Sequence, residues 1–135
     1  MNALDTALVA KLRGDSTLMG YLAAGTASIY SELAPQNAAH PLIVFGEQAE
    51  ADEHTLTERA YEDFRMRVIG VTEGDSMVAG GLIAERIFTV LNDAALSISG
   101  HALLCCRKEG NVRFVESAGG ARFNHSGGVY RIVVR

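Results

Sequence analysis

The sequence of 135 residues has no tryptophan, only two prolines and only two cysteines. The cysteines, Cys105 and Cys106, are adjacent, and neighbours in a strand point to opposite faces, so we expect no bond between them. No CxxC occurs and no Cys/His set has zinc spacing, which excludes a disulfide scaffold and a zinc module. We expect two reduced thiols in a strand, in a reducing compartment.

Long apolar runs are also missing. No stretch approaches the roughly eighteen uncharged apolar residues that a membrane-spanning helix needs. The first residues are unlike a signal peptide, because Asp5 precedes any basic residue and the apolar residues there are periodic rather than continuous. We therefore expect a chain that is made and folded in the cytoplasm.

Basic charge is scarce. The net charge is −4, and the longest basic cluster is the pair Arg107-Lys108. Proteins that read duplex DNA carry a basic surface, so this composition argues against sequence-specific DNA binding. The length and the 48% apolar content predict one domain over residues 1–135. Such a domain buries about two thirds of its unfolded surface and needs no metal or disulfide to fold.

Recognisable catalytic motifs are absent from the sequence. It contains no GxSxG, HExxH or GxGxxG, and the four histidines are scattered, as surface or turn residues would be. The glycine-rich segments 117–120 and 126–128 lack the lysine and the strand–loop–helix context of a phosphate-binding loop, and they predict flexible loops or a bulge. We predict no catalytic residue, no metal ligand and no cofactor.

Helical periodicity is present in two regions. Leu4, Leu8 and Leu12 form one apolar stripe, which Gly14 ends, and Ser16 is placed to cap a second, shorter helix. A third and longer helix is predicted from a cap at 75 or 76 to about residue 92.

Strand patterns fill most of the remaining chain. A short strand is predicted at 29–33, and residues 42–51 and 55–71 predict a long antiparallel hairpin whose turn lies in the charged segment 50–54. In its second strand, Phe64, Met66 and Val68 alternate with Asp63, Arg65 and Arg67, as in a strand with one buried and one solvated face.

The C-terminal part predicts two further strands. The first covers 101–107, turns at 108–111 and returns through 112–116, and the last covers 122–123 and 130–134 with an interruption at 125–128. The predicted fold is α+β: a mainly antiparallel sheet of about four strands, with the long helix and the N-terminal helical segment packed on one face and a long β-hairpin.

The long charged hairpin is the candidate surface for contacts between subunits or with a partner. Alternating charge on an exposed strand face can fix the register of neighbouring subunits in a ring. The candidate interface residues are Glu50, Asp52, Glu53, Arg59, Glu62, Asp63, Arg65, Arg67 and Arg131.

One segment carries a family resemblance. Residues 12–45, LRGDSTLMGYLAAGTASIYSELAPQNAAHPLIVF, combine a leucine-rich helix, a short D-x-x-L helix, a glycine, the junction I-Y-x-x-x-A-P-x-x-x-x-x-P and an apolar strand. The matching residues are Asp15, Leu18, Gly25, Ile29, Tyr30, Ala34, Pro35, Pro41 and the run Leu42 to Phe45. In this order of features, and in the later strand–helix–strand order, the chain resembles the phage tail-terminator or tail-completion family, minor tail proteins of long-tailed phages.

The resemblance implies a non-enzymatic structural role in a virion. Members of that family assemble as a ring, usually a hexamer, on the last ring of the tail tube. There they stop tube polymerisation and present a surface for joining to the filled head. The implied partners are the chain itself, the tail-tube protein and a head–tail connector, with DNA passing through the lumen without sequence-specific binding. The alternatives are another neck protein, either a head-closure protein or a connector adaptor, or a small α+β enzyme or ligand-binding module.

Overall fold

The computed structural model describes the backbone of residues 2–54 and 59–135, and their side chains except for those of residues 49–54, 59 and 60. The N-terminal part contains helices α1 (Asn2–Arg13) and α2 (Ser16–Tyr21) and the 3-10 turn η1 (Gly25–Ser28). The strands are β1 (Ile29–Ser31), β2 (Leu42–His54), β3 (Arg59–Glu73), β4 (Leu103–Ala118) and β5 (Ala121–Val134), with helix α3 (Val78–Leu91) between β3 and β4.

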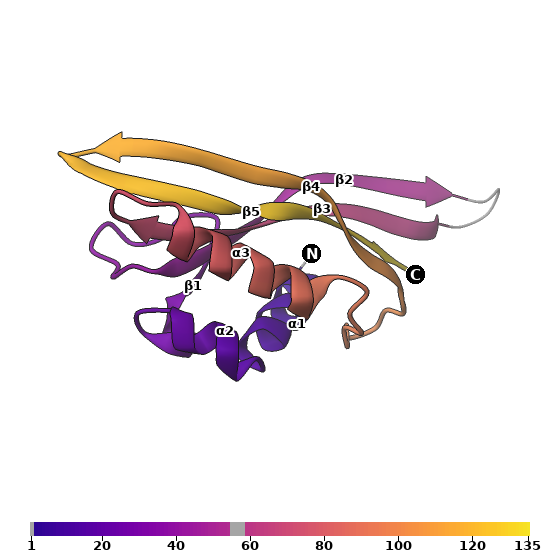
Figure 1. The fold of residues 1–135 in the computed structure, drawn as a ribbon. Coiled ribbons are helices and arrows are strands. Elements are labelled where there is room, and N and C mark those ends of the chain that lie inside the picture. Colours follow the sequence, from indigo (N-terminus) through magenta and orange to yellow (C-terminus); the bar gives the residue numbers. More distant parts are fainter. Residues whose placement is uncertain (1, 55–58) are drawn as a thin grey trace.

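The strands form one sheet in the order β1-β2-β3-β5-β4. β1 runs parallel to β2, and the other neighbours are antiparallel. Helices α1, α2 and α3 cover one face of the sheet, which we call the helix face (Figure 1). Within residues 2–54 and 59–135 no helix lies on the opposite face, which we call the open face. The predicted α+β fold is confirmed, with five strands where about four were expected.

The core lies between the helices and the sheet. The stripe Leu4, Leu8 and Leu12 of α1 is fully buried, as its spacing predicts. The helices pack on the alternating residues of β3 and β5, whose helix-face side chains are completely buried. These strand residues are Phe64, Met66, Val68, Tyr130, Ile132 and Val134. An amphipathic strand and amphipathic helices thus bury their apolar sides against each other.

The turn of the β2–β3 hairpin is farther along than predicted. Residues 50–54 do not form it, because β2 continues to His54 and pairs with β3 as far as Arg59. The expectation for residues 55–58 falls outside the described residues. Pairing with a long partner strand stabilises an extended backbone even where the sequence is rich in charge.

The predicted turn at 108–111 is also wrong. β4 runs through it without a break, and Glu109 is the extra residue of a bulge between the register pairs of Lys108 and Gly110. The turn lies instead at Gly119 and Gly120, whose φ angles of 59° and 80° suit glycine. Charged residues beside a glycine fit a bulge as well as they fit a turn.

The predicted interruption of the last strand at 125–128 is absent, since β5 is continuous. Gly127 is needed there for close approach, because a Cβ on it would lie 2.1 Å from the carbonyl oxygen of Val68 on β3. The glycines therefore mark tight strand contact rather than mobile loops.

Asp15, rather than the predicted Ser16, caps α2. Its carboxylate accepts a hydrogen bond from the N–H of Leu18 at 2.9 Å, and Leu18 is fully buried. The same carboxylate accepts from Nε and Nη2 of Arg86 on α3, at 2.7 and 2.6 Å. The hydrogen bonds from Arg86 lower the pKa of Asp15 most, and the bond from the N–H of Leu18 lowers it further. The D-x-x-L pattern thus joins two helices as well as starting one.

Candidate interaction surfaces

Four of the predicted interface residues lie where only the backbone is described. Glu50, Asp52 and Glu53 belong to β2, and Arg59 begins β3. Glu50 and Asp52 lie opposite Phe64 and Glu62, which still pair with β5, whereas Glu53 and Arg59 lie past the end of β5. Their role in an interface stays a prediction.

Glu62 and Asp63 are buried, whereas the alternating pattern of the strand predicts that its charged face is solvated. Glu62 has the register of the helix face, two residues before Phe64, and lies opposite Val134. Asp63 has the register of the open face and lies opposite Val133. Burial here comes from the neighbouring strand β5, which is distant in the sequence.

Asp63 is the centre of an ion-pair network on the open face. Arg131 of β5 donates to it from Nη2 at 2.8 Å and from Nε at 3.1 Å, and Arg65 donates to it from Nη1. The Nε of Arg65 in turn lies 2.8 Å from a carboxylate oxygen of Glu109 in the β4 bulge. The hydrogen bond from Arg131, aided by the charge of Arg65, lowers the pKa of Asp63 despite its burial.

The structure therefore brings together three of the predicted interface residues, Asp63, Arg65 and Arg131, across β3 and β5. Their polar groups bond mainly to one another and hold strands β3, β5 and β4 in register. Arg67 lies farther along the same face, where its Nη2 is 3.2 Å from a carboxylate oxygen of Glu32.

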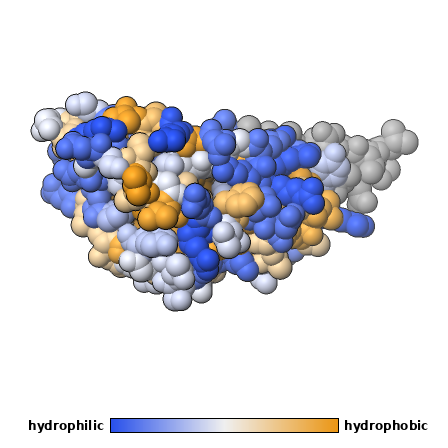
Figure 2. Space-filling view, in the orientation of Figure 1, coloured by the Kyte–Doolittle hydropathy of each residue, from blue (hydrophilic) through white to orange (hydrophobic). Residues whose placement is uncertain are grey.

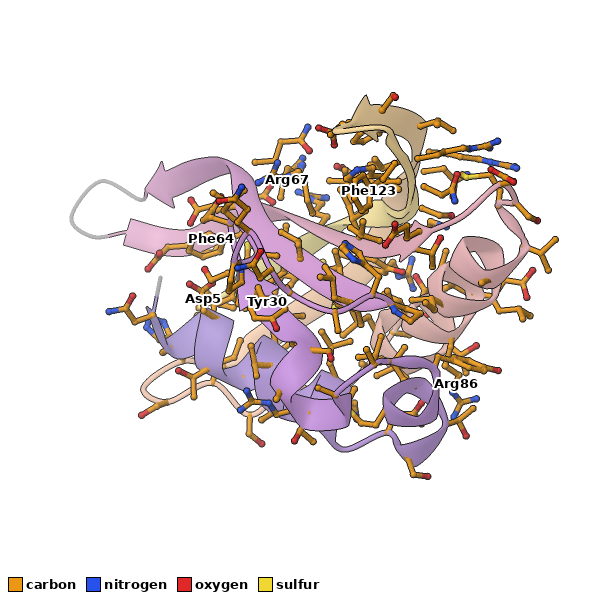
Figure 3. The ribbon with its side chains drawn as sticks, turned by 90° about the vertical axis from the view of Figure 1, so that its left-hand side faces the viewer. Asp5, Tyr30, Phe64, Arg67, Arg86 and Phe123 are labelled. Atoms are coloured by element: carbon orange, nitrogen blue, oxygen red, sulfur yellow. The ribbon has the colours of Figure 1, made fainter. Side chains whose placement is uncertain are left out.

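A groove that the sequence reading missed lies beside Arg67 on the open face. Its volume is about 410 Å³, and it runs between the segment 32–41 and the β4–β5 hairpin. Arg67 and Phe123 both line it, on the side of the sheet away from α1 and α2 (Figure 3). The apolar lining comes from Leu33, Ala34, Pro35, Leu42, Val44, Ile69, Val71, Phe114, Ala118 and Phe123.

The polar side chains of the groove are mostly paired. Nε2 of His125 lies 3.0 Å from a carboxylate oxygen of Glu116, and the imidazole stacks on Phe114 with ring centres 4.2 Å apart. His40 packs against Phe123. The apolar run at residues 42–45, LIVF, is consistent with this groove, because a strand that is apolar at successive positions is covered on both faces.

The arrangement offers surfaces for binding and no cluster of convergent polar groups that would indicate a metal. Across the residues that the structure describes, no group of three or more His, Cys, Asp or Glu side chains could hold a metal ion. No helix in the same residues is long and apolar enough to cross a membrane. Cys106 is buried and Cys105 half-buried, both as free thiols, as adjacent strand positions predict.

Apolar side chains are also exposed away from the groove. They include Val78, Leu82 and Phe88 on α3 and Leu104 and Val115 on β4. The face drawn in Figure 2 shows hydrophobic residues in separate small patches between polar areas. Scattered apolar side chains of this kind are ordinary on a protein surface and do not by themselves mark an interface.

An α+β fold with a groove and two long hairpins offers surfaces for contacts with other macromolecules. The model of the family described as Tail completion protein gp17 matches residues 6–135, so the chain belongs to the tail completion protein gp17 family. It is accordingly a structural protein of a phage-type tail and a component of a virion, which confirms the resemblance seen in residues 12–45.

The fold has a counterpart among solved structures. A chain in the structure titled "Virion of native gene transfer agent (GTA) particle" superposes with a TM-score of 0.81 and 19% sequence identity. The superposition covers 98% of this chain and 95% of that one. A search of curated protein sequences gave no significant match.

Proposed function

We propose that this chain is a tail terminator. It assembles as a ring, with six subunits as the expected number, on the last ring of the tail tube, and it stops tube polymerisation. Its other side presents the surface to which a head–tail connector protein joins. DNA passes through the lumen without sequence-specific contacts, and the chain performs no catalysis.

The observation that carries this proposal is the family match over residues 6–135. The counterpart within a gene transfer agent virion, which covers both chains almost completely, supports a role inside an assembled particle. The groove supports binding rather than catalysis, since Arg67 pairs with Glu32 and His125 with Glu116 instead of converging on one point.

Removal of the protein from an assembling particle tests the proposal. Electron microscopy of a deletion strain should show filled heads without tails, together with tubes that are longer than normal or unstable. Purified protein added to growing tubes should cap them and narrow their length distribution. Normal tube length in the deletion strain, with binding of the protein to filled heads alone, would refute termination and support a head-closure or connector role.

A further inference from the structure

The sheet has an open edge on each of its two sides. β4 is the outermost strand on one side. On the other side β2 pairs with β1 only at Ile43, Val44 and Phe45, so the rest of β2 extends beyond the cover of β1. An open strand edge carries unpaired N–H and C=O groups and is a ready surface for a further strand.

Local contacts cover one part of the β4 edge. The N–H of Asp93 donates to the carbonyl of Cys106 at 2.7 Å, and the N–H of Lys108 donates to Oδ1 of Asn92 at 3.0 Å. The segment that follows α3 thus occupies the edge up to Lys108. In the described parts of the chain, β4 has no strand on its outer side at residues 109–118.

The β2 edge is covered in the same manner. The N–H of Glu32 donates to the carbonyl of Phe45 at 2.7 Å, and the N–H of Glu47 donates to a carboxylate oxygen of Glu32 at 3.3 Å. Beyond Glu47, residues 48–54 of β2 have no outer strand within 2–54 and 59–135. The chain itself therefore covers the β4 edge up to Lys108 and the β2 edge up to Glu47, and in the described chain both edges are uncovered beyond these residues.

The geometry of the two open stretches fits a head-to-tail contact. Three antiparallel pairings separate β2 from β4, so these strands run in opposite directions. Copies related by rotation about an axis roughly along the strands keep their direction, so β2 of one copy meets β4 of the next antiparallel. Because the open stretches lie towards opposite ends of the sheet (Figure 1), they meet when the strands are tilted to the ring axis, as the strands of a closed sheet are.

On the helix face, the charges of the two open stretches are opposite. Arg113 is the charged residue of the β4 stretch with this register, opposite Ser126, and Lys108 lies at the border of the stretch, with its ammonium 5.4 Å from the ring centre of Phe88 on α3. The acidic residues of β4 are bound on the open face, Glu109 by Arg65 and Glu116 by His125.

The open stretch of β2 carries the opposite charge. Residues 48–54, QAEADEH, contain three acidic residues and no lysine or arginine. Pairing of β2 with β2 would place like charges on adjacent strands, which destabilises a sheet. Pairing of β2 with β4 brings Glu50 and Asp52 to the same face as Arg113, so the chemistry favours a heterologous contact, the kind that generates rings.

We propose that residues 48–54 of β2 in one copy pair antiparallel with residues 109–118 of β4 in the next, so that the subunits of the ring share one continuous sheet. The occupant of each edge is a second copy of this chain. This inference rests on the ring assembly of the proposed function and names the surfaces that build it.

A charge exchange tests the pairing. One variant carries Glu50→Lys and Asp52→Lys, and the other carries Asn111→Glu and Arg113→Glu, two positions of the β4 stretch with helix-face register. The assembled fraction of each variant alone should be at least tenfold lower than that of the wild type. Sedimentation velocity measures this fraction under conditions where the wild type assembles, either by itself or on tail-tube protein. An equimolar mixture should regain the wild-type mass, because every contact in an alternating ring joins opposite charges.

The control is the α1 variant Lys11→Glu with Arg13→Glu, which makes a change of net charge of similar size away from both edges and should assemble normally. Circular dichroism checks that every variant is folded. Variants that assemble alone like the wild type, or a mixture that does not recover, would overturn edge pairing and leave the terminator proposal intact. A wild-type chain that remains a single subunit even on tubes would overturn the proposed function itself.

Discussion

Replacement of Asp63 by asparagine should destabilise the subunit by about 2 kcal/mol. Loss of one partner of a fully buried ion pair costs about 3–5 kcal/mol, and an exposed pair contributes about 0–1 kcal/mol. Asp63 is nearly buried, with 10% of its side chain exposed, but Arg65 and Arg131 are 29% and 41% exposed. The expected value lies between the two limits because solvent screens the arginines. Arg65 and Arg131 are also direct cross-strand neighbours, so without the carboxylate like charges would face each other.

The measurement is urea unfolding of the free subunit at neutral pH, with Asp93→Asn as the matched control. Asp93 pairs with Arg107, but both side chains are more than half exposed, so this variant should change the free energy of unfolding by less than about 0.5 kcal/mol. Equal effects of the two substitutions would refute the argument that burial makes the Asp63 network a stabilising one.

The contribution of Asp63 should also depend on pH. Its pKa in the folded chain is lowered from the ordinary value of 3.8, so the folded state binds the proton more weakly than the unfolded state. The stabilisation is therefore complete above the unfolded pKa and is lost as the pH falls through the folded pKa. The difference between wild type and Asp63→Asn should shrink in acid, and a difference that does not change with pH would contradict this account.

Three further outcomes are expected. Gly127→Ala should destabilise by about 1–3 kcal/mol in urea unfolding, because its Cβ would overlap the β3 backbone, while Gly81→Ala on α3, with open space around it, should be neutral or stabilising. Phe64→Ala should cost about 3–5 kcal/mol in the same assay. Burial raises the pKa of Cys106 to about 12, so a thiol reagent at neutral pH should label Cys105 first, as mass spectrometry of the peptides would show.

Local pattern was sufficient to predict the elements that bury one side. The stripe Leu4, Leu8 and Leu12 and the alternation through Phe64 and Met66 are short-range periodicities, and both are confirmed by complete burial. Such patterns repeat within a few residues, so the sequence alone contains the information needed to read them.

The errors arose where a distant strand decides the outcome. Glycine and charge at 108–111 predict a turn locally, yet pairing with β5 keeps the segment extended and leaves Glu109 as a bulge. Asp63 and Arg131 are 68 residues apart in the chain, so no local sequence pattern could predict their ion pair. The groove likewise combines the segment 32–41 with parts of β3 and the β4–β5 hairpin, and only the clue in LIVF pointed towards it.

The two hairpins point in opposite directions along the sheet (Figure 1), and their ends differ in composition. The β4–β5 end, SAGGA, is small and uncharged, whereas β2 ends in the acidic sequence EADEH. In the proposed ring, one rim would therefore consist of compact neutral loops and the other would carry the acidic strand ends. A ring of this kind has a front and a back, so a tube and a connector would each meet a different chemical surface.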